Sequence, residues 1–214
     1  MAQQTKNGFG PVDIVINNAG LVQGKSFLES DDNMSSKIMV VNAECNMWIL
    51  KEFLPDMVKN NEGHVVAIAS LAGIGGVCGL TDYCASKFAQ YGFHEALRVE
   101  MKSMKKDITV TTICPFFINT GMFAGTQMSY IAPLLKDKYV AQRIVSAILQ
   151  SEEEVVIPWR FNWLVRLSRL ILTSSAMDKL NQITGGFDCM ATFKGRGEKN
   201  ALHQVQVKKN LEDN

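Results

Sequence analysis

The sequence lacks the features that mark several classes of protein. It has no uninterrupted apolar run of ~18 residues, which argues against a membrane-spanning helix. The opening segment, Met1 to Gly10, is polar and shows no apolar core of a secretory signal. The 22 Lys+Arg nearly balance the 21 Asp+Glu, which gives no long-range attraction to nucleic acid. We therefore expect an intracellular chain with no nucleic-acid partner.

Signatures of metal binding and of disulfide bonding are also missing. The 5 cysteines include no Cys-x-x-Cys pair and are odd in number, so free thiols in a reducing compartment are expected. Only 3 histidines are present. In the segment that begins His94-Glu95, Arg98 stands where a zinc-protease helix needs its second histidine. No metal site is expected.

Short apolar runs alternate along the chain with longer helical patterns. Strand-like composition occurs at 12–16, 64–69, 108–114 and 155–157, and it is typical of buried parallel strands. Helices are predicted within 30–60, which is long enough for two, and at 83–104 and 136–150. This alternation predicts an α/β fold with a mainly parallel sheet. We assign the domain to residues 1–158, a helical extension to 159–197 and a polar tail to 198–214.

Small and polar residues follow three of the predicted strands. Asn17-Asn18-Ala19-Gly20 comes after the first, Ser70 after the second, and 115–120 at the end of the third. Parallel sheets bind their ligands beyond the carboxyl ends of the strands. These three segments are therefore expected to meet at one crevice.

A tyrosine and a lysine open the helix predicted over 83–104. Tyr83 and Lys87 stand four residues apart, which puts both side chains on one face. A free tyrosine, with a pKa of about 10, is a poor base at neutral pH, but a neighbouring ammonium lowers that pKa. Tyr83 is therefore predicted to exchange the proton of a substrate hydroxyl, with Ser70 donating a hydrogen bond to the substrate oxygen. The alternative is a half-buried helical tyrosine beside a surface lysine.

Together these residues resemble the short-chain dehydrogenase/reductase family. Asn17 to Gly20, Ser70 and Tyr83-x-x-x-Lys87 occur in that family's order and spacing, and Asn42 stands at the position of the family's catalytic asparagine. The run from Ile113 to Phe123 is most similar to family 16C, the epidermal retinol dehydrogenase-like branch. The 17-beta-hydroxysteroid dehydrogenase type 11 group is a near neighbour.

The resemblance implies a role for each residue. Tyr83 would accept the proton in alcohol oxidation, Lys87 would lower the pKa of Tyr83 and hold the nicotinamide ribose, and Ser70 would bind and orient the substrate. Asn42 would anchor a water that links Lys87 to solvent. The implied substrate is a lipophilic alcohol or ketone, retinol- or steroid-like. The implied cofactor is NAD or NADP, contacted by Asn18, Ala19, Gly20, Tyr83, Lys87, Pro115, Ile118 and Thr120.

The chain departs from the family's pattern in two places. Phe116 follows Pro115 where the family has glycine, and its bulk is expected to reshape the wall of the substrate site. The family's Gly-rich turn is expected ahead of residue 17, so on the order of 60–70 residues, two βαβ units, are expected to be absent. The glycines of 73–79 lack the spacing of a phosphate-binding turn. We therefore predict a partial Rossmann-like parallel sheet in an N-terminally truncated, marginally stable chain, whose first strand has an exposed apolar edge.

Residues 159–180 form an amphipathic segment. Leu164, Leu167 and Ile171 fall on one helical stripe, flanked by Arg166 and Arg169. Such a helix suits a membrane interface, and packing on the domain or against a second subunit is the alternative. The resembling branch acts at the endoplasmic reticulum membrane or lipid droplets. The chain is thus expected in the cytoplasm or at the surface of those membranes, and a homo-oligomer is a further expected partner state.

Three functions are compatible with these observations. The first is an NAD(P)-dependent oxidoreductase acting on a lipophilic alcohol or ketone. The second is an inactive remnant that keeps the catalytic residues but does not hold the cofactor. The third is an interaction module that uses the exposed strand edge to join a full-length relative. Family resemblance alone does not establish activity.

Overall fold

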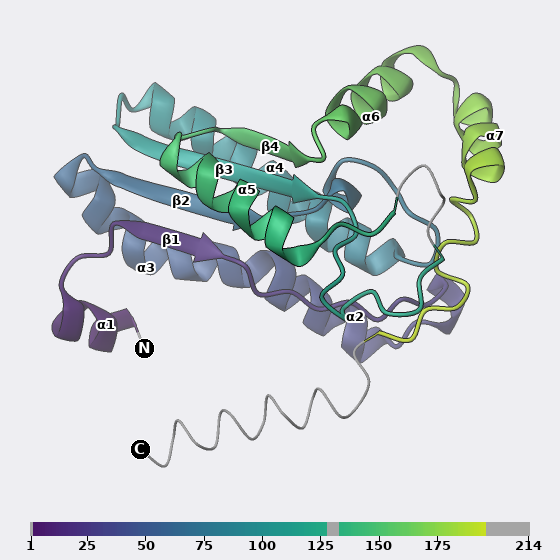
Figure 1. Ribbon diagram of the computed structural model, residues 1–214. Helices are drawn as coiled ribbons and strands as arrows, with labels where there is room; N and C mark the ends of the chain where they lie inside the picture. Colours follow the sequence, from purple (N-terminus) through teal and green to yellow (C-terminus); the bar gives the residue numbers. More distant parts are fainter. Residues whose placement is uncertain (1, 128–132, 196–214) are drawn as a thin grey trace.

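The computed structural model describes residues 2–127 and 133–195, and within them one four-stranded parallel sheet is formed. The strands lie in sequence order (Figure 1), as β1 (Ile14–Asn17), β2 (Gly63–Ile68), β3 (Ile108–Pro115) and β4 (Glu154–Ile157). Every pairing is parallel, and Ile16 is in register with Val66. The predicted α/β class and parallel, Rossmann-like sheet are confirmed, with strand ends shifted by at most about two residues.

The predicted helices are present as well. α2 (Asp32–Met39) and α3 (Cys45–Asn60) share the stretch predicted for two helices and are joined by a π-helical segment, Val40–Glu44. The remaining helices of the domain are α4 (Thr81–Ser103) and α5 (Asp137–Leu149). Asp31 caps α2, because its side chain accepts a hydrogen bond of 2.7 Å from the amide of Met34.

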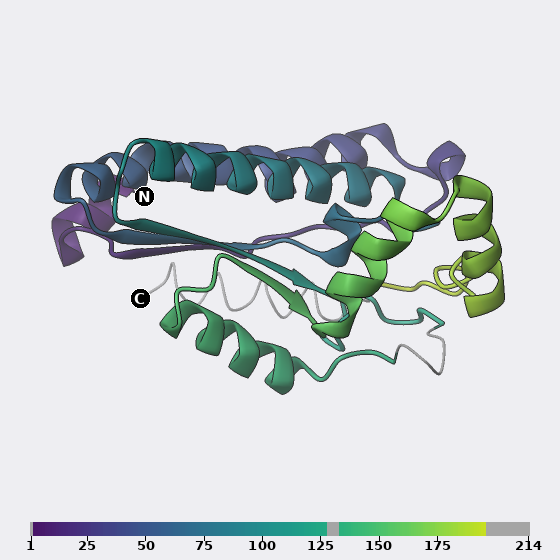
Figure 2. The same cartoon turned by 90° about the horizontal axis from the view of Figure 1, so that it is seen from above.

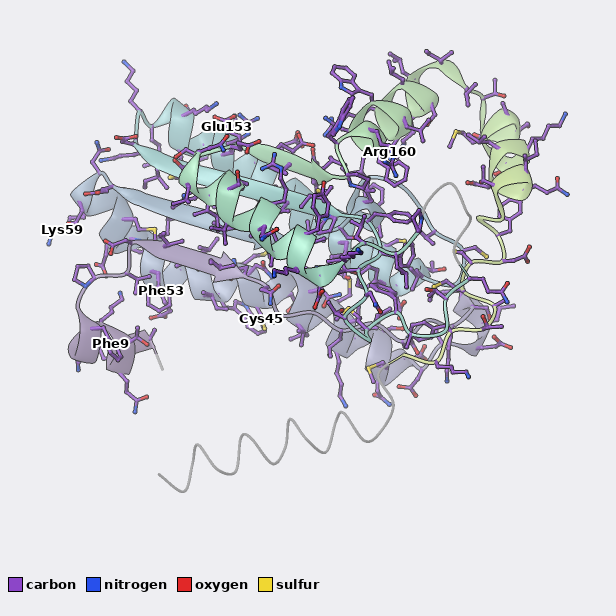
Figure 3. The ribbon with its side chains drawn as sticks, in the orientation of Figure 1. Phe9, Cys45, Phe53, Lys59, Glu153 and Arg160 are labelled. Carbon is purple, nitrogen blue, oxygen red and sulfur yellow. The ribbon has the colours of Figure 1, made fainter. Side chains whose placement is uncertain are left out.

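A short helix that the sequence patterns did not indicate precedes the sheet. α1 (Ala2–Phe9) has no buried residue and contacts α3 through Lys6. The Lys6 ammonium lies 2.7 Å from Asp56 and 5.7 Å from the centroid of the Phe53 ring. Figure 3 labels Phe53 on α3, next to α1. An exposed ion pair and a cation–π contact are weak, so α1 is held loosely.

Helices cover the two faces of the sheet unequally. Figure 2 shows α3 and α4 together on one face and α5 on the other. The α3–α4 face holds a core that joins Val15, Val65 and Val110 to side chains such as Leu50 and Leu97. The opposite core packs α5 against strands β2 to β4, with no β1 residue among its buried members. The second face is therefore covered over β2 to β4 and open over β1.

The open part of that face exposes apolar side chains of β1. Ile14 and Ile16 are 47% and 51% exposed, whereas Val15 between them is 8% exposed. Side chains alternate along a strand, so Val15 faces α3 and its neighbours face the side of α5. Within the described residues β1 pairs with β2 only. The predicted exposed, apolar strand edge is confirmed.

Two helices beyond β4 form the predicted C-terminal extension. α6 (Arg160–Ile171) leaves the carboxyl end of β4, and α7 (Ser174–Thr184) follows it away from the sheet (Figure 1). Phe161 is buried in a cluster with Cys114 and Val156, which anchors the start of α6. No helix in the described part of the chain has the length and apolarity to cross a membrane. The predicted polar tail lies outside the described residues.

Candidate active site

The first turns of α4 carry the predicted Tyr–Lys pair. Tyr83 and Lys87 are both buried, at 5% and 3% exposure, and the Lys87 ammonium lies 5.8 Å from the centroid of the Tyr83 ring. α4 packs against β3 and the short helical turn Leu71–Gly73 that follows β2. The four-residue spacing therefore places both side chains where the strands end, as predicted.

The Lys87 ammonium is held by neutral oxygen atoms. Its Nζ donates to the carbonyl of Ile68 at 2.9 Å and to Oε1 of Gln90 at 2.8 Å. Burial lowers the pKa of Lys87 to about 8, since a buried charge is poorly solvated. A lysine ammonium has three N–H donors. Two are bonded within the described residues, so one is left for a ligand.

Burial is the largest influence on the pKa of Tyr83. Burial raises the pKa of Tyr83 well above its ordinary value, and a hydrogen bond with the Ser70 side chain acts in the opposite direction. The sequence predicted that Lys87 would lower this pKa. The structure differs because the phenol is almost inaccessible to water. The Tyr83 side chain is thus uncharged at neutral pH.

Ser70 reaches Tyr83 because its segment packs tightly on α4. Its Oγ accepts a hydrogen bond of 3.1 Å from the amide of Ala72, which caps the turn Leu71–Gly73. A Cβ added at Gly73 would lie 2.6 Å from the carbonyl oxygen of Lys87, so only glycine allows this approach. Gly73 therefore positions Ser70 and Tyr83 and contributes to packing rather than to a phosphate-binding turn.

Asn42 fixes the segment that follows β1. Its Oδ1 accepts from the amide of Leu21 at 2.7 Å, and its Nδ2 donates to the carbonyl of Leu21 and to Oγ of Ser86, both at 2.9 Å. Asn42 belongs to the π-helical segment, an irregularity often found at functional sites. The water-anchoring role implied for Asn42 stays a prediction. Its side chain in this structure ties the 18–21 segment to α4.

Gly20 tests whether the site fits a nicotinamide cofactor. A Cβ at this position would lie 3.6 Å from Oδ1 of Asn42 and 4.0 Å from the Lys87 ammonium. A larger side chain would therefore fill the space beside the donor that Lys87 keeps free. Asn18 and Ala19 precede Gly20 in the same irregular segment. The space beside Gly20 and the Lys87 ammonium fits a nicotinamide cofactor, in which Lys87 would contact the ribose. The cofactor contacts implied for Asn18 and Ala19 stay predictions.

Of the three residues expected at the site in the segment 115–120, only Pro115 lies near it. Pro115 ends β3 directly after Cys114, which is close enough to Lys87 to affect its pKa. Ile118 packs instead with the α5 core and pairs with Leu135. Thr120 is exposed in the following turn. The cofactor contacts implied for Ile118 and Thr120 stay predictions.

Of the aromatic side chains beside the site, only Phe116 was identified from the sequence, and it was expected in the wall of the substrate site. Phe123 meets the Tyr83 ring edge-on at 5.9 Å between centroids, and Phe117 meets Phe123 at 4.7 Å. Phe116 turns to Phe161 of α6, at 5.0 Å. Phe116, where the family has glycine, thus joins the domain to its extension. No spacing rule identifies such loop aromatics, because their contacts depend on how the loop folds back.

Comparison with known proteins agrees with this geometry. Residues 1–130 match the family model described as short chain dehydrogenase. The chain belongs to the short-chain dehydrogenase/reductase family. The predicted resemblance to branch 16C is also confirmed. Short-chain dehydrogenase/reductase family 16C member 6 from Bos taurus is 41% identical over 97% of this chain and 66% of its own length. Epidermal retinol dehydrogenase 2 from Mus musculus is 40% identical over 93% of this chain and 65% of its own length.

Retinol dehydrogenase 10 from Homo sapiens is more distant, at 34% identity over 98% of this chain and 62% of its own length. The chain therefore spans about two thirds or less of the length of these curated relatives. A solved structure of a short-chain dehydrogenase/reductase from Burkholderia phymatum, in complex with NAD, is also similar, with a TM-score of 0.67 and 23% sequence identity. The match covers 78% of this chain and 69% of that protein's chain. The similarity to that structure supports the fold.

Proposed function

We propose that this chain carries the proton-transfer half of an NAD(P)-dependent oxidoreductase that interconverts a lipophilic alcohol and its carbonyl compound. The observation that carries the proposal is that Ser70, Tyr83 and Lys87 come together where β2 ends and α4 begins, with Ser70 beside the Tyr83 phenol and the Lys87 ammonium 5.8 Å from the centroid of the Tyr83 ring. Bound NAD(P) would supply or accept the hydride. The relatives' names, among them two retinol dehydrogenases, support a lipophilic substrate.

The three side chains divide the work at the substrate oxygen. The neutral Tyr83 phenol is suited to give its proton to the oxygen of a carbonyl substrate. Ser70, whose side chain lies close enough to the Tyr83 phenol to lower its pKa against the effect of burial, is suited to hold that oxygen in place. Lys87 has one N–H left for a ribose hydroxyl, and its positive charge favours the phenolate when Tyr83 acts in the oxidation direction.

The surroundings of Tyr83 support an apolar substrate. Its hydrophobic cluster includes Phe117, Phe123 and Val77, and the segment around Met190 packs against the same cluster. Such side chains bury a hydrocarbon favourably and offer it few hydrogen bonds. A polyene or a fused-ring alcohol suits this wall better than a sugar or a hydroxy acid does.

The test uses two proteins. The chain 1–214 alone is expected to bind NADH weakly, since Gly73 packs on α4 and Gly79 on Met190. A chimaera that carries two βαβ units with a Gly-rich turn from an intact family member ahead of the chain is expected to bind NADH or NADPH and to turn over apolar alcohols or aldehydes. Saturable micromolar NADH binding by chain 1–214 would overturn the first expectation. Cofactor binding by the chimaera without turnover would overturn the proposed activity.

A second candidate function rests on the free edge of β1. Within the described residues the main chain of β1 is unpaired on the side away from β2, next to the exposed Ile14 and Ile16, and this edge suits pairing with a strand of an intact family member. The chain would then act as an interaction module. Co-purification of tagged chain with an intact 16C relative tests this. Failure to co-purify at micromolar concentration would end the candidate.

We also propose that α6 and α7 lie on a membrane surface. Arg166 bonds Glu154 and Tyr91, and Arg169 bonds the carbonyl of Ile74, so this side of α6 packs on the domain. The stripe predicted from the sequence faces away from it and is exposed, together with Trp163 and Leu170. The surface cations Arg160 (Figure 3) and Lys179 suit anionic headgroups. One side of α6 thus packs on the domain, and the opposite side is the one proposed to contact the membrane.

A further inference from the structure

A buried glutamine connects the lysine of the site to the asparagine of the site. Gln90 lies one turn beyond Lys87 on α4 and is fully buried. Its Oε1 accepts from the Lys87 ammonium at 2.8 Å, and its Nε2 donates to Oδ1 of Asn46 at 2.9 Å. Burial of an amide is unfavourable unless such bonds are made. Gln90 is thus bonded on both sides of its amide.

The connection continues to Asn42. Nδ2 of Asn46 donates to the main-chain carbonyl of Asn42 at 3.0 Å, and the Asn42 side chain donates to Ser86 on α4. Oγ of Ser86 in turn donates to the carbonyl of Tyr83 at 2.7 Å. These hydrogen bonds join α3, the π-helical segment and α4 in one network. Asn46 and Gln90 thus connect the main chain of Asn42 to the Lys87 ammonium.

We propose that Gln90 is a positioning residue for Lys87: its Oε1 holds the ammonium toward Gly20 and Tyr83 and stabilises its charged form, and its Nε2 ties that position to Asn42 through Asn46. The inference rests on the proposed function for its catalytic meaning, but the contact itself is independent of turnover. The second acceptor, the Ile68 carbonyl, cannot adjust because it belongs to β2. Of the two groups that accept a hydrogen bond from the Lys87 ammonium, Gln90 is therefore the one whose position can change.

The titratable groups that face Lys87 do not replace this contact. Tyr83 presents its ring to the ammonium, and Cys114 on β3 is near enough to raise the pKa of Lys87 slightly against the effect of burial. His94, on the same helix, has its own pKa lowered to about 4, mainly by burial, so it is neutral around pH 8. No carboxylate forms an ion pair with Lys87 within the described residues. Loss of Oε1 therefore leaves the ammonium with a single acceptor.

The experiment measures the titration of Lys87 by NMR of the full chain labelled with 13C,15N-lysine, with the signal assigned through Lys87→Met. The unaltered chain is expected to titrate near pH 8. Gln90→Leu, which removes the acceptor, is expected to lower that midpoint by about one pH unit, and Gln90→Glu to raise it by a similar amount. Gln142→Leu, at an exposed glutamine of α5, is the control and is expected to leave it unchanged.

A purely structural role would make each Gln90 variant less stable without moving the Lys87 midpoint. An unchanged midpoint in folded Gln90→Leu would overturn the proposal. Where Gln90→Leu does not fold, Gln90→Met, which keeps the shape and lacks the oxygen acceptor, takes its place with the same expected result. An inactive chimaera together with shifted midpoints would refute the proposed function and leave the Gln90 contact established, so the two failures are distinguishable.

Discussion

The two faces of the sheet differ in how much of their surface is covered by helices. The α3–α4 face holds an apolar core, which includes Leu50 and Val65, and the buried hydrogen-bond network of Lys87 and Gln90. On the α5 face, the core reaches β2 and stops, so Ile14 and Ile16 remain half exposed. The comparison teaches that Asn42, Tyr83 and Lys87 come from elements of the well-covered face, whereas Ile118 packs with the α5 core. The other face contributes surface that is open to other molecules.

The largest expected change in unfolding free energy comes from removing a side chain of the core. Leu50→Ala on α3 removes a fully buried side chain and is expected to cost about 2–5 kcal/mol of unfolding free energy. The matched change Leu149→Ala on α5, where the leucine is 80% exposed, is expected to cost less than about 0.5 kcal/mol. Urea unfolding measures both. Equal losses would contradict the unequal coverage.

Acid is expected to weaken the covered face next. His94 is fully buried, and burial lowers its pKa from 6.5 to about 4, so between these values the unfolded chain binds a proton that the folded chain does not. Stability should therefore fall as the pH falls from 6.5 to 4, by about 3 kcal/mol from this residue. The measurement is urea unfolding across this range, with His94→Leu for comparison. A slope that His94→Leu leaves unaltered would show that other groups cause it.

A smaller effect is expected at the membrane surface. Leu170 on α6 is 82% exposed, much like Leu149 on α5, so the two leucines form a matched pair. Leu170→Glu should reduce flotation with anionic liposomes about fivefold, since it removes one inserted apolar side chain. Leu149→Glu should leave flotation unchanged. Absence of flotation by the unaltered chain would end the membrane proposal.

The smallest effect on stability is expected at the strand edge. Ile16→Lys places a charge on an already exposed position and should change the unfolding free energy by no more than about 0.5 kcal/mol. It should nevertheless suppress concentration-dependent association, because a charged edge resists pairing. Light scattering at several concentrations compares it with the parent. An unaltered association state would mean that the β1 edge is not the contact surface.

The sequence predicted the framework well because periodicity and strand-end residues are local signals. The strands, the long α4 and the meeting of Ser70 with Tyr83 all followed from them. The raised pKa of Tyr83 did not, because burial depends on the turn that Gly73 brings against α4. Nor did Gln90, which reads as an ordinary helical glutamine until Asn46 on α3 is found opposite it. Contacts between elements distant in sequence determine both.

The most direct test of the central claim is the rate of hydride transfer in the chimaera with and without the Tyr83 hydroxyl. Tyr83→Phe keeps the ring that meets Phe123 and removes only the proton donor. Tyr139→Phe, at an exposed position of α5, is the matched control. We predict that Tyr83→Phe lowers kcat for an apolar aldehyde by about 10²–10⁴-fold, whereas Tyr139→Phe keeps the parental kcat. Retention of parental kcat in Tyr83→Phe would contradict the assignment of this site.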